Sequence, residues 1–141
     1  MIILDTNVLS ALMQPSPEKV VSRWLDSQPS ESIWTTTITL FEIHLGLENM
    51  APGSRKMNLT SAFDMLLHQD LENRVLDLDS AAAMAAAMFA AARRAAGRSV
   101  DVRDTLIAGI AVARRGSIAT RNIKHFEDAG IPILNPWGEE H

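Results

Sequence analysis

The sequence contains no cysteine, and it lacks any long stretch of strongly hydrophobic residues. The absence of cysteine excludes disulfides and thiolate metal sites, so a bound metal must be held by oxygen or imidazole, and the 17 acids far outnumber the four histidines. The longest apolar tract, residues 81–92, is mostly alanine and too short to span a bilayer. We therefore expect a chain with no membrane-spanning segment and, if it binds metal, an oxygen-rich site.

The chain also lacks the positive charge of a protein that coats nucleic acid, because its formal net charge is −4. Its basic residues are nevertheless clustered, with eight of the 13 lysines and arginines in residues 93–124. This cluster fits either a phosphate-binding surface or an ordinary solvated helix face. No basic flank precedes Asp5, so we expect no signal peptide and a cytoplasmic protein.

Short apolar runs alternate with segments of helical periodicity along the whole chain. This alternation predicts α/β architecture, a three-layer α/β/α sandwich with a mainly parallel sheet of four to five strands, in one domain over residues 1–141. The expected strands are residues 2–4, 33–35, 75–76, 117–120 and, as an edge strand containing a proline, 131–134. The expected helices lie at residues 8–13, 20–25, 38–50, 59–67, 81–96 and 106–113.

Asp5 directly follows the first predicted strand, Ile2-Ile3-Leu4. Ligands of open parallel sheets bind beyond the carboxyl ends of the strands, so this position can deliver a carboxylate to a binding crevice. The same aspartate can instead cap the helix that follows. The two interpretations are about equally supported by this residue alone.

Glu42 lies on the apolar side of its predicted helix, where its neighbours one turn away are Ile38, Thr39, Leu45 and Gly46. A buried carboxylate is costly unless it is paired or protonated. Its partner is therefore either a metal ion or an arginine in a buried ion pair.

Asp104 lies three residues after Asp101, which can cap the last long helix. That spacing alone explains an acid in the first turn of a helix. Asp104 is also one turn before the small, apolar run Ala108-Gly109, which would let the helix press closely against the sheet and place Asp104 at its edge. Three carboxylates from separate segments can converge on one hard cation such as Mg²⁺ or Mn²⁺, which activates water for attack on a phosphodiester.

Four sequence motifs resemble those of the PIN-domain family, and within it the VapC and FitB-like toxins of bacterial toxin–antitoxin pairs. They are residues 1–10 with Asp5, residues 38–46 with Glu42, residues 104–111 with Asp104, and residues 119–126. Residues 133–137 are similar to the closing strand and tail of the family. One departure is Asn122, where some members have an aspartate, which leaves open whether one or two ions bind.

The resemblance implies a Mg²⁺- or Mn²⁺-dependent endoribonuclease, a homodimer and a cognate antitoxin that blocks the acidic site and supplies DNA binding. The substrate would be RNA, with transfer RNA and structured RNA as candidates. Asp5, Glu42 and Asp104 would be the catalytic metal ligands. Thr6, Thr120 and Asn122 would support the site, the last two from its rim, and Arg121 would contact RNA.

Two other functions are consistent with parts of the pattern. A haloacid-dehalogenase-like phosphatase also begins with a strand and an aspartate, but it requires a second acid two residues later, where this chain has Asn7. A catalytically silent binding module with the same fold would keep the architecture without metal dependence. His44, His68 and His125 do not have metal-binding spacing, and the sequence assigns them no chemistry.

Overall fold

A computed structural model, which describes residues 1–138, contains a sheet of five strands that all pair in parallel. The strand order is β3-β2-β1-β4-β5, so β1 is central and β5 is at an edge, as expected from its proline-containing sequence. The strands are β1 (Ile2–Leu4), β2 (Ile33–Thr36), β3 (Val75–Leu76), β4 (Ser117–Ala119) and β5 (Ile133–Leu134).

Helices connect these strands, and each predicted helix is present within a few residues of its expected bounds. Aspartate or threonine side chains cap four of them at the N-terminus by accepting a backbone N–H: Asp5, Thr36, Asp79 and Asp101. The helices are α1 (Thr6–Leu12), α2 (Lys19–Asp26), α3 (Thr37–Glu48), α4 (Ser54–Met65), α5 (Ser80–Ala95) and α6 (Val102–Arg114). Shorter turns are η1 (Ser30–Ser32), the π-type turn η2 (Leu66–Asp70) and η3 (Ile123–His125).

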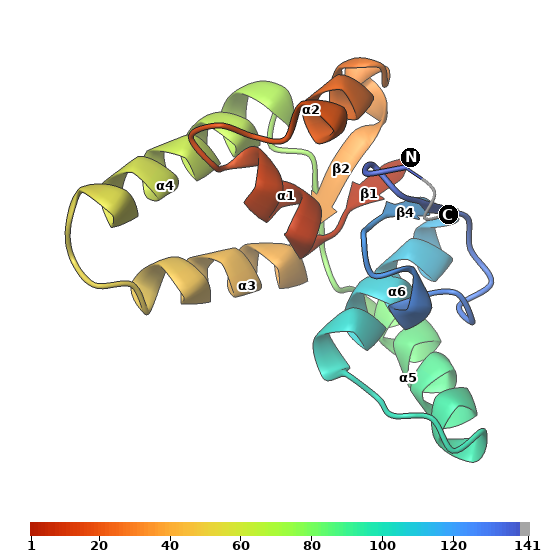
Figure 1. Ribbon diagram of the computed structural model, residues 1–141. Helices are drawn as coiled ribbons and strands as arrows, with labels where there is room; N and C mark the ends of the chain where they lie inside the picture. The colour runs from red at the N-terminus through yellow and green to blue at the C-terminus, as the bar shows by residue number, and fades with distance from the viewer. Residues whose placement is uncertain (139–141) are drawn as a thin grey trace.

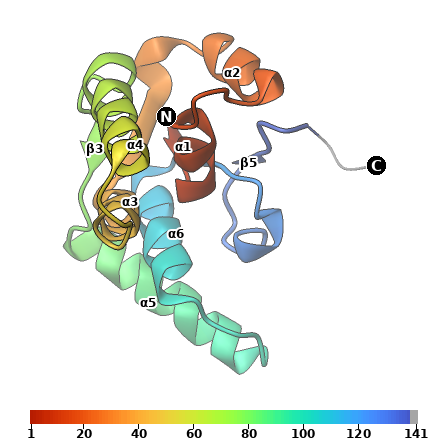
Figure 2. The same cartoon turned by 60° about the vertical axis from the view of Figure 1, so that its left-hand side comes forward.

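The sheet separates two hydrophobic cores, which gives the three layers predicted from the sequence. Successive side chains of β1 point to opposite faces, so Leu4 packs in the core formed with α1 to α4 and Ile3 in the core formed with α5 and α6. Figure 1 shows α5 and α6 together on one side of the sheet and α1 to α4 on the other, and Figure 2 shows the same grouping after rotation.

Helix α6 approaches α5 very closely at Gly109. A Cβ atom at this position would lie 2.5 Å from the carbonyl oxygen of Ala82 and 2.6 Å from the Cβ of Ala86. The close contact expected between this helix and the sheet is therefore wrong for Gly109, which faces the neighbouring helix instead. Gly109 of α6, with Ala82 and Ala86 of α5, thus forms a close helix–helix contact.

The position of β1 determines where a ligand can bind. The chain leaves β1 for β2 on one side of the sheet and later returns to place β4 on the other, so the strand order reverses between β1 and β4. In open parallel sheets, this reversal opens a crevice at the carboxyl ends of the two strands.

None of the helices within residues 1–138 has the length and apolar character needed to span a membrane.

Candidate active site

Asp5 lies in this crevice, immediately after β1. Its side chain is 3% exposed. Its carboxylate accepts hydrogen bonds from the backbone N–H of Thr6 at 2.8 Å and from the hydroxyl of Thr120 at 2.8 Å. The pKa of Asp5 is raised from 3.8 to about 6, mainly by burial and in smaller part by the charges of Asp104 and Glu42, while these two hydrogen bonds oppose the shift. Asp5 is thus both a helix cap and a buried acid that feels the charges of the other two.

Thr120 follows β4, on the opposite side of the crevice, and is buried rather than at the rim. Its hydroxyl oxygen also accepts the side-chain amide of Asn7 at 3.2 Å and the backbone N–H of Asn122 at 3.0 Å. The Asn122 side chain is exposed, and its contact with this network is through the backbone. The network ties the ends of β1 and β4 together and fixes the Asp5 carboxylate.

Glu42 is on α3, with its side chain 19% exposed. Its carboxylate accepts the Thr6 hydroxyl at 3.0 Å and lies 3.7 Å from the guanidinium of Arg103. Burial is the main reason that the pKa of Glu42 is raised, while the Thr6 hydrogen bond and the Arg103 charge lower it. An ion pair with an arginine is therefore present, although Arg103 is half exposed rather than buried as that alternative expected.

Asp104 is in the first turn of α6, where its backbone N–H is capped by Asp101 at 3.1 Å. Its own carboxylate, at 17% exposure, accepts a hydrogen bond from Nδ1 of His125 at 2.6 Å. Burial and the charge of Asp101 raise the pKa of Asp104, and His125 opposes that shift. The capping arrangement and a place beside the other two acids thus coexist.

The three acids share one electrostatic environment, since Asp5 and Glu42 each feel the charge of Asp104. Within residues 1–138, however, no three carboxylate or imidazole side chains are close enough to hold one ion in the positions described. Two of the acids are instead bound to cationic or hydrogen-bonding groups of the chain, Arg103 and His125. Neither residue was given a role by sequence reasoning.

The cluster of basic residues divides into members that form ion pairs and members that do not. Four of its arginines form ion pairs with acids of the chain: Arg93 with Asp128, Arg98 with Glu127 and Asp128, Arg103 with Glu42, and Arg114 with Asp79. Arg121 and Lys124 are exposed and have no ion pair within residues 1–138. The guanidinium of Arg121 lies over the Trp137 ring at 4.9 Å, and its backbone N–H donates to Asn7 at 3.3 Å, so it is held beside the crevice.

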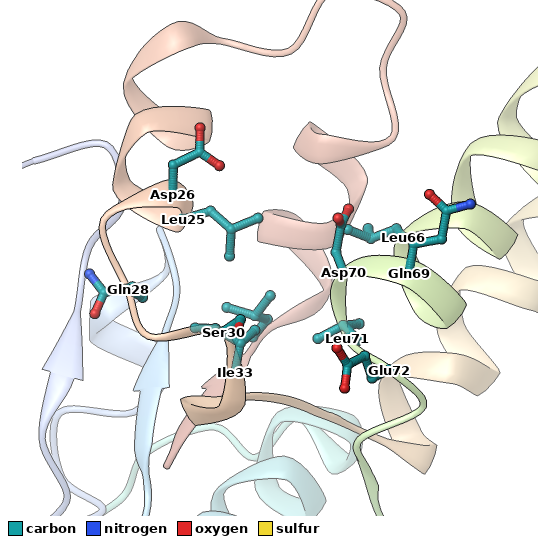
Figure 3. Close-up of a pocket in the computed structure, with 11 residues that line it drawn as sticks. Leu25, Asp26, Gln28, Ser30, Ile33, Leu66, Gln69, Asp70, Leu71 and Glu72 are labelled. Atoms are coloured by element: carbon teal, nitrogen blue, oxygen red, sulfur yellow. The ribbon is translucent and has the colours of Figure 1, made fainter.

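A cavity of about 250 Å³ lies elsewhere, between α2 and η2 (Figure 3). It is bordered by the residues that precede β2 and β3, and by three acids, Asp26, Asp70 and Glu72. None of the three predicted catalytic acids lines it. Because three acids and no lysine or arginine line the cavity, its negative charge repels a phosphodiester. The cavity is therefore unsuited to binding nucleic acid.

Comparison with known proteins identifies the family of this architecture. The PIN domain model matches residues 2–131. Plasmid stability protein StbB of Pseudomonas syringae pv. tomato is 39% identical over 137 residues, covering 97% of this chain and 99% of the relative. The VapC ribonuclease Y4jK of Sinorhizobium fredii is 36% identical, covering 97% and 98%. Toxin FitB of Neisseria gonorrhoeae is 31% identical, covering 97% and 99%.

Solved structures give the same result for the fold. The structure of FitAB bound to a DNA fragment superimposes with a TM-score of 0.88 at 31% sequence identity, covering 100% of this chain and 99% of that one. The structural similarity extends over the parallel sheet and its helices. The similarity in sequence to the relatives also covers nearly their whole length. The chain belongs to the PIN-domain family.

Proposed function

We propose that this chain is a divalent-metal-dependent endoribonuclease and the toxin of a toxin–antitoxin pair. The observation that carries this proposal is the buried carboxylate of Asp5, placed at the reversal of strand order beside Glu42 and Asp104. Burial raises the pKa of all three acids, and the charge of Asp104 raises the pKa of the other two further, so a cation is favourable at this site. The names of the relatives, a VapC ribonuclease and a FitB toxin, support the substrate and the biological role.

The donor set suits Mg²⁺ or Mn²⁺, because it consists of carboxylate oxygens without thiolate or clustered imidazole. Asp5, Glu42 and Asp104 would hold the ion once Arg103 yields its contact with Glu42 to it, while His125 contacts only one oxygen of Asp104. When bound, such an ion lowers the pKa of water and neutralises charge on a phosphate. The asparagine at position 122 is a neutral amide and a poorer ligand than an aspartate.

The residues of the chain have separate tasks in this proposal. Thr6 and Thr120 fix the Asp5 carboxylate through hydrogen bonds of 2.8 Å each, and the Thr6 hydroxyl also holds Glu42. Arg121 and Lys124, exposed beside the crevice, attract and hold the RNA backbone. The overall negative charge then disfavours indiscriminate binding to nucleic acid.

We further propose a cognate antitoxin as partner, a homodimer as the assembly of the toxin, and transfer RNA or another structured RNA as substrate. The solved structure of FitAB bound to a DNA fragment supports a toxin that acts in a complex with a partner and with DNA. The absence of cysteine suits action in a reducing cytoplasm.

The test is cleavage of a panel of transfer RNAs and structured RNAs by antitoxin-free protein, with Mn²⁺, Mg²⁺ or EDTA. We expect metal-dependent cleavage that Asp104→Asn abolishes while the circular dichroism spectrum stays unchanged. Cleavage that survives both EDTA and the substitution would contradict the proposal.

Folded protein that binds no metal and cuts no RNA would favour the silent binding module instead. The phosphatase alternative is disfavoured by the family and by Asn7, whose side-chain amide donates to Thr120 at the position where that enzyme class needs an acid.

A further inference from the structure

His125 forms a hydrogen bond with one oxygen of the Asp104 carboxylate. Its Nδ1 lies 2.6 Å from Oδ2 of Asp104, and because a carboxylate only accepts, Nδ1 carries the hydrogen. The imidazole is about half exposed. The position of its backbone therefore limits where the ring can lie.

That backbone is held by Arg93 of α5. The Arg93 side chain is 7% exposed, and its guanidinium forms two hydrogen bonds with the Asp128 carboxylate, at 3.0 and 2.7 Å. The same guanidinium donates to the carbonyl oxygen of His125 at 2.6 Å and stacks over the Phe89 ring at 4.6 Å. A planar, bidentate arginine of this kind is a rigid clamp on the turn η3.

The segment between Thr120 and Asp128 thus connects the two acids of the crevice. At one end the Thr120 hydroxyl binds Asp5, and toward the other His125 binds Asp104. Arg98 adds a second anchor by pairing with Asp128 at 3.1 Å. A displacement of this segment would change the orientation of both carboxylates.

We propose that His125 is a positioning residue for Asp104, and that the Arg93–Asp128 clamp fixes His125 in place. The inference rests on the proposed function, since it assumes that Asp104 binds the catalytic ion. By holding Oδ2, His125 limits rotation of the carboxylate, so that Oδ1 would be the oxygen available to an ion. Hydrogen-bonding partners of this kind contribute about 10- to 100-fold to metal affinity when they orient a ligand.

The test measures Mn²⁺ dissociation constants by electron paramagnetic resonance on the intact protein. We expect His125→Ala to weaken Mn²⁺ binding about tenfold or more. His125→Asn should restore most of the affinity, because the amide nitrogen of asparagine can take the place of Nδ1. His68→Ala is the matched control, since His68 also makes a 2.6 Å contact through Nδ1, with Asn73, away from the acids.

The clamp is tested with Arg93→Lys, which keeps the charge and loses the bidentate geometry. We expect weaker Mn²⁺ binding, by several-fold. Arg74→Lys is its control, because Arg74 is also largely buried and donates to backbone carbonyls, including that of Ile33 at 2.8 Å. Urea unfolding of both variants separates loss of stability from loss of ion affinity.

Three outcomes are informative. Weakened binding in His125→Ala and Arg93→Lys, with rescue by His125→Asn and no change in either control, supports the inference. Wild-type affinity in His125→Ala overturns it while leaving the proposed function standing. A wild-type protein that binds no Mn²⁺ would overturn the proposed function, and this inference with it.

A kinetic measurement distinguishes positioning from a general structural role. At limiting Mn²⁺ we expect His125→Ala to lower kcat for RNA cleavage, with recovery at excess Mn²⁺ and an unchanged KM for RNA. A raised KM that excess Mn²⁺ does not correct would assign His125 to RNA contact and overturn the positioning role.

Discussion

The carboxyl group of Asp5 is buried beside two other acids, and this burial raises its pKa from 3.8 to about 6. Between these values the folded protein binds more protons than the unfolded chain, so the free energy of unfolding falls as the pH rises. The loss in the free energy of unfolding persists at neutral pH, where the buried carboxylate is charged. For a pKa shift of this size the loss amounts to roughly 3 kcal/mol.

Asp5→Asn should therefore stabilise the metal-free protein near neutral pH, by up to about 3 kcal/mol, and lose this advantage near pH 4. The asparagine can still accept the Thr6 N–H as a helix cap. Urea unfolding in EDTA at the two pH values measures the difference. Equal destabilisation of the variant at both pH values would mean that the charge of Asp5 carries no such cost in the folded protein.

Arg121 is the residue where RNA recognition can be separated from catalysis. We expect Arg121→Gln to raise the KM for RNA with little change in kcat, and to reduce the salt dependence of binding by about 0.7 in the log–log slope, the contribution of one contact to single-stranded nucleic acid. Arg23→Gln, an exposed arginine on α2 away from the acids, is the control. An unchanged KM and slope in Arg121→Gln would exclude the contact.

At the scale of elements, two glycines in helix interiors have opposite surroundings. Gly109 of α6 presses on α5, where a new Cβ would lie 2.5 Å from a backbone oxygen, while Gly46 of α3 has nothing within 4 Å of that position. Gly109→Ala should thus lower the free energy of unfolding by about 1–3 kcal/mol. Gly46→Ala should raise it by about 0.5–1 kcal/mol, through helix propensity.

Thermal or urea unfolding of the two variants tests this contrast. An unchanged free energy of unfolding in Gly109→Ala would show that α5 and α6 can separate without cost.

For the whole molecule, a bound ion should offset the repulsion among the three acids. We expect Mn²⁺ at about 100 times its dissociation constant to stabilise the protein by about 2.7 kcal/mol, through preferential binding to the folded state. EDTA should reverse the shift, and Asp104→Asn should largely remove it. A thermal shift of the same size in that variant would place the ion elsewhere.

Most of the architecture was predictable from local sequence. The strand Ile2–Leu4, the edge strand near Ile133 and the caps at Asp5 and Asp101 were all expected, because hydrophobic period and capping chemistry depend on neighbouring residues. The small differences are in helix bounds and in the neighbour of Gly109. That neighbour depends on how α5 and α6 pack, which periodicity does not specify.

The candidate site was predictable in part, and the roles of its acids remain predictions. The sequence placed Asp5 after a strand and Glu42 on the apolar side of a helix. Because burying a charge is costly, it also predicted that Glu42 would have a partner such as an arginine. No local signal indicated His125, since its contact with Asp104 joins residues 21 apart in the chain. Nor did the basic cluster reveal which arginines are neutralised by acids.

The sequence by itself determined the α/β alternation, the places where strands and helices begin, and the acid at the end of the first strand, because these depend on short-range periodicity and capping. Only the tertiary structure decided which side chains contact the carboxylates of Glu42 and Asp104. Arg103 reaches Glu42, and His125 reaches Asp104, because separate elements are packed against one another. Such contacts depend on the three-dimensional arrangement of distant segments, which no local pattern contains.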